Sequence, residues 1–300
     1  MKAGRETLRD SDSAASRTAD FLELTKPRIT ILVLVTTMVA FYVGIRGGLP
    51  LPLLCHTLFG TALVAGGASA FNMYLERNLD ALMLRTIRRP LPSGRVQSGE
   101  ALLFAVVISS AGMIYLFVFV NPLTSLLSAL TFLSYLFLYT PLKTRTWLCT
   151  IIGAVPGALP ATMGWAAATG RLSAGAWVLF GIVFLWQMPH FYAVGWMYRE
   201  DYARAGFPML PVIDATGSRT GRQVNLYNIV LILLTLLPLV MGLAGFYYLA
   251  GALVLGLLYL IYGAIFSMRR DRKSAKQLFL VSIAYLPVLM TLLMIDKVKP

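Results

Sequence analysis

Charged residues are scarce in this chain. Only 13% of its 300 residues are Asp, Glu, Lys or Arg, whereas about 25% is usual for a soluble domain. The two cysteines, Cys55 and Cys149, lie in or beside apolar runs, which excludes a disulfide framework and a cysteine-based zinc site. Residues 1–28 contain six basic and five acidic residues and no apolar core. This composition excludes a signal peptide and an acid-poor transit peptide.

Apolar residues are abundant instead. They make up 58% of the chain, and the mean hydropathy is +0.72, which predicts a membrane protein. A helix needs about 20 apolar residues to cross a bilayer. Runs near that length predict an all-α, polytopic fold with about nine transmembrane helices, at 29–45, 53–75, 101–119, 122–140, 148–168, 174–196, 224–242, 244–267 and 278–295. The breaks at Asn121-Pro122 and Gly242/Gly245 are the shortest.

The basic residues predict an orientation. Of 26 Lys and Arg residues, 22 fall in segments on the side of the N-terminus and four on the other side. This bias places the N-terminus in the cytoplasm and the C-terminus outside, and it accounts for the net charge of +13 without a nucleic-acid partner. We expect a polar cytoplasmic tail at 1–28 and one transmembrane domain at 29–295. Similar inner loops at 89–94 and 207–211 suggest two similar halves, about 29–140 and 148–267, followed by a last helix at 278–295.

The end of the second apolar run carries a polar face. Asn72, Glu76 and Asp80 are spaced i, i+4 and i+8, and no Pro or Gly interrupts them, so they share one face of a continuing helix. Two carboxylates beside lipid are costly unless a cation compensates them. That cation is either Mg²⁺, which shares oxygen ligands with phosphates, or arginines from the set Arg77, Arg85, Arg88 and Arg89. A plain salt-bridged loop remains the alternative.

A second, weaker cluster follows the sixth run. Glu200 and Asp201 are adjacent and therefore point to different helix faces, so they hold a second Mg²⁺ or pair with neighbouring arginines. Deeper in the run, Pro189 predicts a kink, and His190 falls in the apolar region, where polar side chains usually face the bundle interior. A lone buried histidine is more often hydrogen-bonded than catalytic.

Five stretches in this order resemble the UbiA superfamily of intramembrane prenyltransferases, and within it the branch that farnesylates haem. They are Asn72 to Leu91, Tyr139 to Lys143, Gly153 to Trp165, Trp186 to Phe191 and Asp201 to Pro211. The resemblance implies helices around a central cavity, a bacterial inner-membrane location, farnesyl diphosphate and Mg²⁺ as requirements, and haem b as acceptor. The product it implies is haem O for terminal oxidases, with haem A synthase or oxidase assembly factors as candidate partners.

The resemblance also implies roles for residues. Mg²⁺ would be held by Asn72, Glu76 and Asp80 with help from Asp201, although many family members have more aspartates in the second motif than this chain. The diphosphate would lie against Arg85, Arg88, Arg89 and Lys143. Tyr135 and Tyr139 are candidates to stabilise an allylic cation. His190 would orient haem or handle a proton.

Two other functions are weighed against this one. A prenyltransferase acting on an aromatic quinone precursor is disfavoured by the Trp186-to-Phe191 stretch. A secondary transporter would fit broken helices and repeats, but transporters bind near the bilayer midplane, whereas the carboxylates here lie at the inner edge. A purely structural membrane subunit is disfavoured by the paired acid and arginine clusters.

Overall fold

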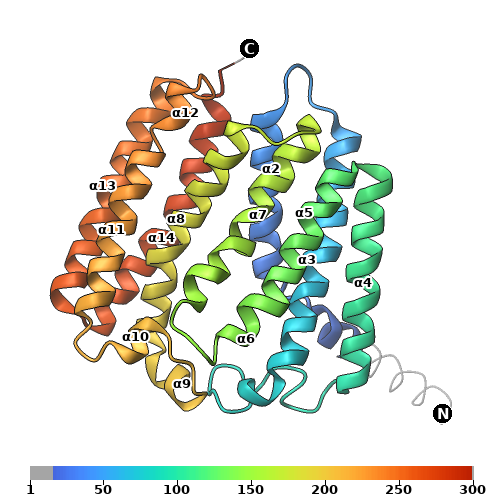
Figure 1. Cartoon of the computed structure of the whole chain (residues 1–300), viewed down its shortest axis with the longest axis vertical. Helices are drawn as coiled ribbons and strands as arrows, with labels where there is room; N and C mark the ends of the chain where they lie inside the picture. The colour runs from blue at the N-terminus through green and yellow to red at the C-terminus, as the bar shows by residue number, and fades with distance from the viewer. Residues whose placement is uncertain (1–15, 299–300) are drawn as a thin grey trace, which may run out of the picture.

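The computed structural model describes residues 16–298, in which helices joined by turns and loops make up the regular structure, apart from one isolated bridge. Nine of the helical segments in this range are long and apolar enough to cross a membrane, as predicted (Figure 1). They are α2 (Pro27–Gly44), α3 (Leu51–Asp80), α4 (Ser98–Phe119), α5 to α6 (Pro122–Leu142), α7 (Cys149–Thr169), α8 (Ala174–Met197), α11 to α12 (Ser218–Val240), α13 (Phe246–Arg269) and α14 (Arg272–Ile295).

The two short breaks between spans lie where the sequence predicted them. Asn121 caps α5, because its side chain accepts a hydrogen bond of 2.8 Å from the Thr124 backbone N–H, and Pro122 starts the helix. Between α12 and α13, Gly242 adopts a φ of 67°. That left-handed conformation suits glycine and ends the helix.

Three local features distinguish these spans from plain apolar helices. Helix α3 continues five residues beyond its apolar run and ends at Asp80, as the missing Pro and Gly predicted. The fourth span contains a π-helix, η1 (Ser134–Tyr139), before the short α6 (Thr140–Leu142); π-helical turns are frequent at functional sites. Pro189 lies within α8, which continues past it to Met197.

The spans pack as one body. The largest apolar core joins residues of α2 and α7 to residues of α8, α11, α13 and α14, so α2 and α7 contact the later helices directly. The single transmembrane domain and its division into two similar halves both stay predictions.

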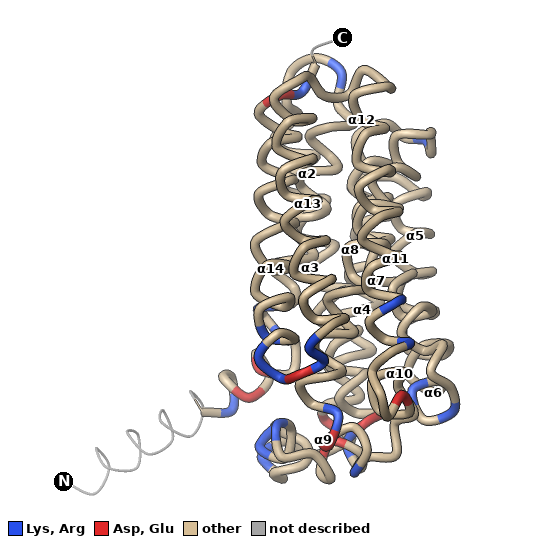
Figure 2. The backbone as a smooth tube through the Cα atoms, turned by 90° about the vertical axis from the view of Figure 1, so that its left-hand side faces the viewer, with Lys and Arg blue, Asp and Glu red and all other residues tan. Residues whose placement is uncertain are grey.

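Charged residues gather at one end of the bundle. Figure 2 shows most Lys, Arg, Asp and Glu at the end that carries α9 (Arg199–Arg204) and α6, while α12 lies at the opposite end. Residues 16–24 of the predicted polar tail form a helix at this charged end, and residues 1–15 lie outside the described part. Arg95, in the loop before α4, holds that helix against the bundle through ion pairs with Asp20 and Glu23.

Candidate active site

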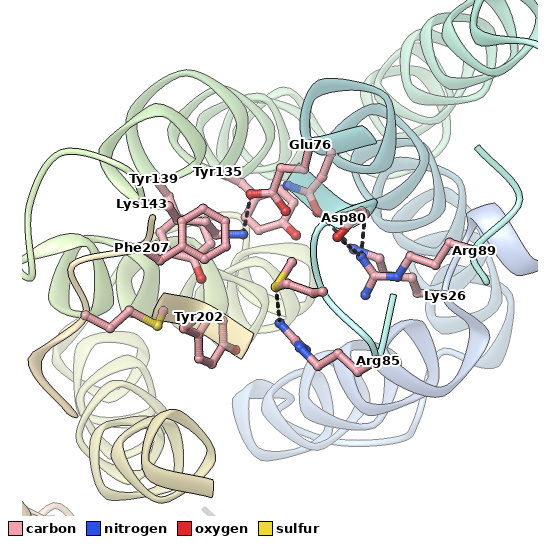
Figure 3. Close-up of a pocket in the computed structure, with 13 residues that line it drawn as sticks. Lys26, Glu76, Asp80, Arg85, Arg89, Tyr135, Tyr139, Lys143, Tyr202 and Phe207 are labelled. Atoms are coloured by element: carbon pink, nitrogen blue, oxygen red, sulfur yellow. Dashed lines mark hydrogen bonds and ion pairs between the residues drawn. The ribbon is translucent and has the colours of Figure 1, made fainter. Parts of the chain in front are cut away.

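The polar face predicted on α3 is buried at the charged end of the bundle. Asn72, Glu76 and Asp80 are 1%, 5% and 1% exposed. Each meets a different basic side chain, as Figure 3 shows for the two carboxylates. Lys143 Nζ donates to Glu76 Oε1 at 2.6 Å, and Arg89 Nη1 donates to both Asp80 carboxylate oxygens, at 2.8 and 2.7 Å.

The third basic side chain, Lys26, donates to Asn72 Oδ1 at 2.9 Å. It lies directly before Pro27 with a φ of 48°, a left-handed conformation that is uncommon for residues other than glycine. Such outliers persist where the surrounding structure enforces them, often at functional sites. Burial and the neighbouring Arg89 lower the pKa of Lys26 to about 7. An anionic ligand beside it would favour the charged form.

Lys143 is placed by the end of the fourth span. It follows η1 and α6, and its ammonium lies 4.5 Å from the centre of the Tyr139 ring. Burial opposes its charge, but the Glu76 carboxylate and the adjacent tyrosines outweigh burial and raise the pKa of Lys143 above its ordinary value. Lys143 therefore remains a cation in this setting.

These groups line a cavity of about 150 Å³. Four basic side chains and two carboxylates contribute to its wall, which gives an excess of positive charge. The cavity is smaller than the 300–1,000 Å³ of sites that enclose a whole small ligand, so it suits a charged head group. Its lining residues are Lys26, Asn72, Glu76, Asp80, Met83, Arg85, Arg89, Tyr135, Tyr139, Lys143, Tyr202, Phe207 and Met209.

Aromatic rings form part of the same wall. Tyr135 and Tyr139 stack with ring centres 5.7 Å apart. The Arg85 guanidinium lies 4.7 Å from the centre of the Tyr202 ring and 5.7 Å from that of Tyr198. Arg85 makes no ion pair with a carboxylate of the described residues; Nη2 donates to Met83 Sδ at 3.8 Å, and its other donors are available to an anion.

The structure does not bring Asp201 or Arg88 into this cavity. Asp201 pairs with Arg204 on α9 and faces a neighbouring cleft. Successive helical residues point about 100° apart, so α9 turns Tyr202 toward the cavity and Asp201 away from it. Arg88 is exposed, and its carbonyl accepts a hydrogen bond from Arg95. Residues 16–298 hold no group of three or more His, Cys, Asp or Glu side chains placed to bind a metal.

His190 lies apart from the cavity, on α8. Its Nδ1 is 2.7 Å from Ser282 Oγ, and the Ser282 hydroxyl donates to the Phe279 carbonyl at 2.6 Å. Because that hydroxyl proton is already used, the network assigns the imidazole proton to Nδ1 and leaves Nε2 as an acceptor. The ring stacks on Trp186 at 5.4 Å and lies 5.1 Å from Phe279.

Several lining residues were missed by the sequence analysis. Lys26 was counted only as a basic residue of the tail, although a lysine directly before the first span is a usable signal. Tyr202 and Met209 lie within a stretch that carried the resemblance, but no role followed from it. Met83 and Phe207 also lie within stretches that carried the resemblance, and no role followed for them either.

The comparisons with known proteins agree with this geometry. The model of the UbiA prenyltransferase family matches residues 33–286. The chain belongs to this family. A protohaem IX farnesyltransferase of Solibacter usitatus is 46% identical over 287 residues, covering 93% of this chain and 98% of that protein.

Solved structures show the same fold for this UbiA prenyltransferase. One of a digeranylgeranylglyceryl phosphate synthase aligns with a TM-score of 0.80 at 15% identity, covering 95% of this chain and 99% of that one. A UbiA homologue from Archaeoglobus fulgidus, bound to GPP and Mg²⁺, aligns with a TM-score of 0.65 at 17% identity, covering 91% and 99%. Because the family and the fold are those of prenyltransferases, the interpretation as a secondary transporter is no longer supported.

The donor set of this UbiA prenyltransferase fits Mg²⁺. Asn72, Glu76 and Asp80 present hard oxygen atoms along one face of α3, and Mg²⁺ takes such ligands together with phosphate oxygens. In the structure the two carboxylates are neutralised by Lys143 and Arg89 instead. The Lys143 and Arg89 side chains are long and flexible. With Mg²⁺ on the carboxylates, their charged groups would bind phosphate oxygens instead.

Proposed function

We propose that this protein transfers the farnesyl group of farnesyl diphosphate to a vinyl group of haem b, with addition of water. The observation that best supports this function is a buried polar face on α3, formed by Asn72, Glu76 and Asp80, in a small cavity with excess positive charge. Such a cavity binds a diphosphate, and its place at the end of the apolar spans lets a prenyl chain extend among them. The choice of haem as acceptor rests on relatives such as the farnesyltransferase of Solibacter usitatus.

The reaction joins two carbon atoms and releases diphosphate. The bond between farnesyl C1 and the diphosphate oxygen breaks, and both electrons leave with the oxygen. The vinyl π electrons attack the resulting allylic cation, which leaves a cation on the carbon beside the porphyrin ring. Water adds there and loses a proton, so the product carries a hydroxyethylfarnesyl group.

The residues of the cavity divide this work. Arg85, Arg89 and Lys143 bind the diphosphate through charge-assisted hydrogen bonds. Asn72, Glu76 and Asp80 would hold Mg²⁺, which when bound neutralises charge on the leaving group. The faces of Tyr135 and Tyr139 stabilise positive charge near C1.

An acceptor comparison tests this function. Purified protein with Mg²⁺ and farnesyl diphosphate is given either haem b or 4-hydroxybenzoate, and diphosphate release is followed. Release should depend on haem, stop with EDTA and return with excess Mg²⁺. Release that depends on 4-hydroxybenzoate and not on haem would instead support the prenylation of a quinone precursor.

Two neighbouring arginines should differ in effect. Arg89 lines the cavity and contacts Asp80 through Nη1 alone, whereas Arg88 is exposed outside it. Lysine keeps the charge but loses the planar fork. Arg89→Lys should therefore weaken farnesyl diphosphate binding about 10-fold or more, while Arg88→Lys, the matched control, should change it less than about twofold. Calorimetric titration measures both. A larger loss of farnesyl diphosphate affinity in Arg88→Lys than in Arg89→Lys would show that Arg88 contacts the diphosphate.

Membrane orientation is a further prediction. If the charged end faces the cytoplasm, a reporter fused after Pro300 should read as periplasmic and one inserted at 270–271, between α13 and α14, as cytoplasmic. Paired phosphatase and fluorescent-protein fusions measure this in a bacterial inner membrane. A cytoplasmic C-terminus would contradict the orientation or the count of nine spans.

A further inference from the structure

A second cavity adjoins the first at the charged end of the bundle. It has a volume of about 630 Å³, and Arg85 belongs to the walls of both. The ends of α8, α9 and the turn between α13 and α14 form its other walls. It is a cleft rich in guanidinium groups, contributed by Arg85, Arg199, Arg204, Arg270 and Arg272.

Most of these arginines have no carboxylate partner. Arg204 pairs with Asp201, but the other four make no ion pair with any residue of 16–298. Arg270 has a structural role, since its guanidinium donates hydrogen bonds to the backbone carbonyls of Ser267 and Thr216. Three guanidinium groups of the cleft, those of Arg85, Arg199 and Arg272, are thus left with donors for an anionic ligand.

The five arginines of the cleft outnumber its three carboxylates, Glu200, Asp201 and Asp271, so its net charge is positive. Asp271 is committed to capping α14, because its Oδ1 accepts from the Ser274 backbone N–H at 2.7 Å. Arg199 stacks on the Trp196 ring at 4.9 Å, which holds its fork in place without using its in-plane donors. A preorganised guanidinium fork matches a carboxylate with two parallel hydrogen bonds.

The cleft also has apolar lining residues, Leu84, Trp196 and Met197, and the last two lie on the same helix as His190. Met197 in the cleft and His190 are seven residues apart on α8, so they share one face about 10 Å apart. Arg272 and Phe279 have the same spacing on α14, and the His190 and Phe279 rings are 5.1 Å apart. These two faces of α8 and α14 run side by side from the charged end into the membrane. His190, with its unprotonated Nε2, lies along them.

We propose that this cleft binds the two propionate groups of the haem acceptor, with Arg199 and Arg272 as carboxylate-binding residues and the macrocycle directed along α8 toward His190. The proposal rests on the proposed function for the identity of the acceptor. The propionates occupy one edge of haem b and the vinyl groups lie away from them. Binding the propionates here directs the vinyl groups into the membrane, where the prenyl chain lies. The volume of the cleft falls within the range of sites for ligands of this class.

The test compares haem b with its dimethyl ester, in which both propionates are uncharged. Each is titrated by its Soret absorption against the purified protein in neutral detergent, without farnesyl diphosphate, for wild type, Arg199→Gln, Arg272→Gln and the exposed control Arg145→Gln. Wild type and the control should bind haem b about 10-fold or more tightly than the ester. Each cleft variant should lose about 10-fold for haem b and little for the ester.

The outcomes separate this proposal from the proposed function. Equal binding of haem b and ester by wild type, or equal losses for both ligands in the cleft variants, would overturn the propionate site even if farnesyl transfer to haem occurs. Discrimination that depends on Arg199 and Arg272 without any farnesyl transfer would leave the site standing and reject the function. Displacement of haem b by phosphatidylglycerol, lost in the same variants, would assign the cleft to lipid head groups.

Discussion

Glu76→Gln and Asp80→Asn should each lower the rate of prenyl transfer by about 10²–10³-fold, the usual cost of removing a group that stabilises developing charge. Both carboxylates are buried and lie in the cavity with four basic side chains. Each amide has nearly the shape of the carboxylate it replaces and can still accept a hydrogen bond from Lys143 or Arg89. It loses the negative charge that Mg²⁺ requires. Turnover with saturating haem b measures the loss.

The controls for this prediction distinguish chemistry from folding. Glu23→Gln makes the same change at a carboxylate that pairs with Arg95 outside the cavity, and its turnover should stay near that of wild type. All three variants should elute as monodisperse protein in detergent, and thermal unfolding should confirm that they are folded. Turnover above about a tenth of wild type in both cavity variants would contradict the assignment of α3 as the metal face.

His190→Phe should impair the use of haem without changing the binding of farnesyl diphosphate. Phenylalanine preserves the ring packing on Trp186 and Phe279 but removes Nε2, the acceptor that the Ser282 hydrogen bond leaves free. We expect the KM for haem b to rise about 10-fold or more, the effect of one lost interaction with a charged or coordinating partner. The KM for farnesyl diphosphate should be unchanged, because His190 does not line the diphosphate cavity.

The other histidine of the chain provides a matched control. His56 bonds to Tyr115 at 2.7 Å near the start of α3, opposite the charged end, and His56→Phe should leave both KM values unchanged. If His190→Phe instead weakens farnesyl diphosphate binding and spares haem, the two substrates lie in the opposite places.

The sequence predicted the part of the site that is local along the chain. Asn72, Glu76 and Asp80 lie on one continuous helix, so their spacing alone predicts a common face. Lys143 and the two tyrosines likewise lie within one short stretch. The common face of the first three depends only on helical periodicity and on the cost of burying charge, whereas the roles of Lys143 and the tyrosines followed from the resemblance.

The rest of the site depends on contacts and angles that local sequence does not encode. Lys26 lies 46 residues before Asn72, and only the packing of α2 against its neighbours brings them together. Which of Asp201 and Tyr202 faces the cavity depends on the change of direction between α8 and α9, where Tyr198 leaves the helical conformation. A shift of one residue at that junction would place Asp201 where Tyr202 now lies.

The mass of the product tests the central claim most directly. Purified protein is incubated with haem b, farnesyl diphosphate and Mg²⁺ in water enriched in ¹⁸O, and the porphyrins are analysed by mass spectrometry. Transfer followed by addition of water predicts a haem that has gained one farnesyl group and one hydroxyl that contains ¹⁸O. Recovery of unmodified haem b from protein that binds both substrates, or a farnesylated haem without the label, would contradict the account.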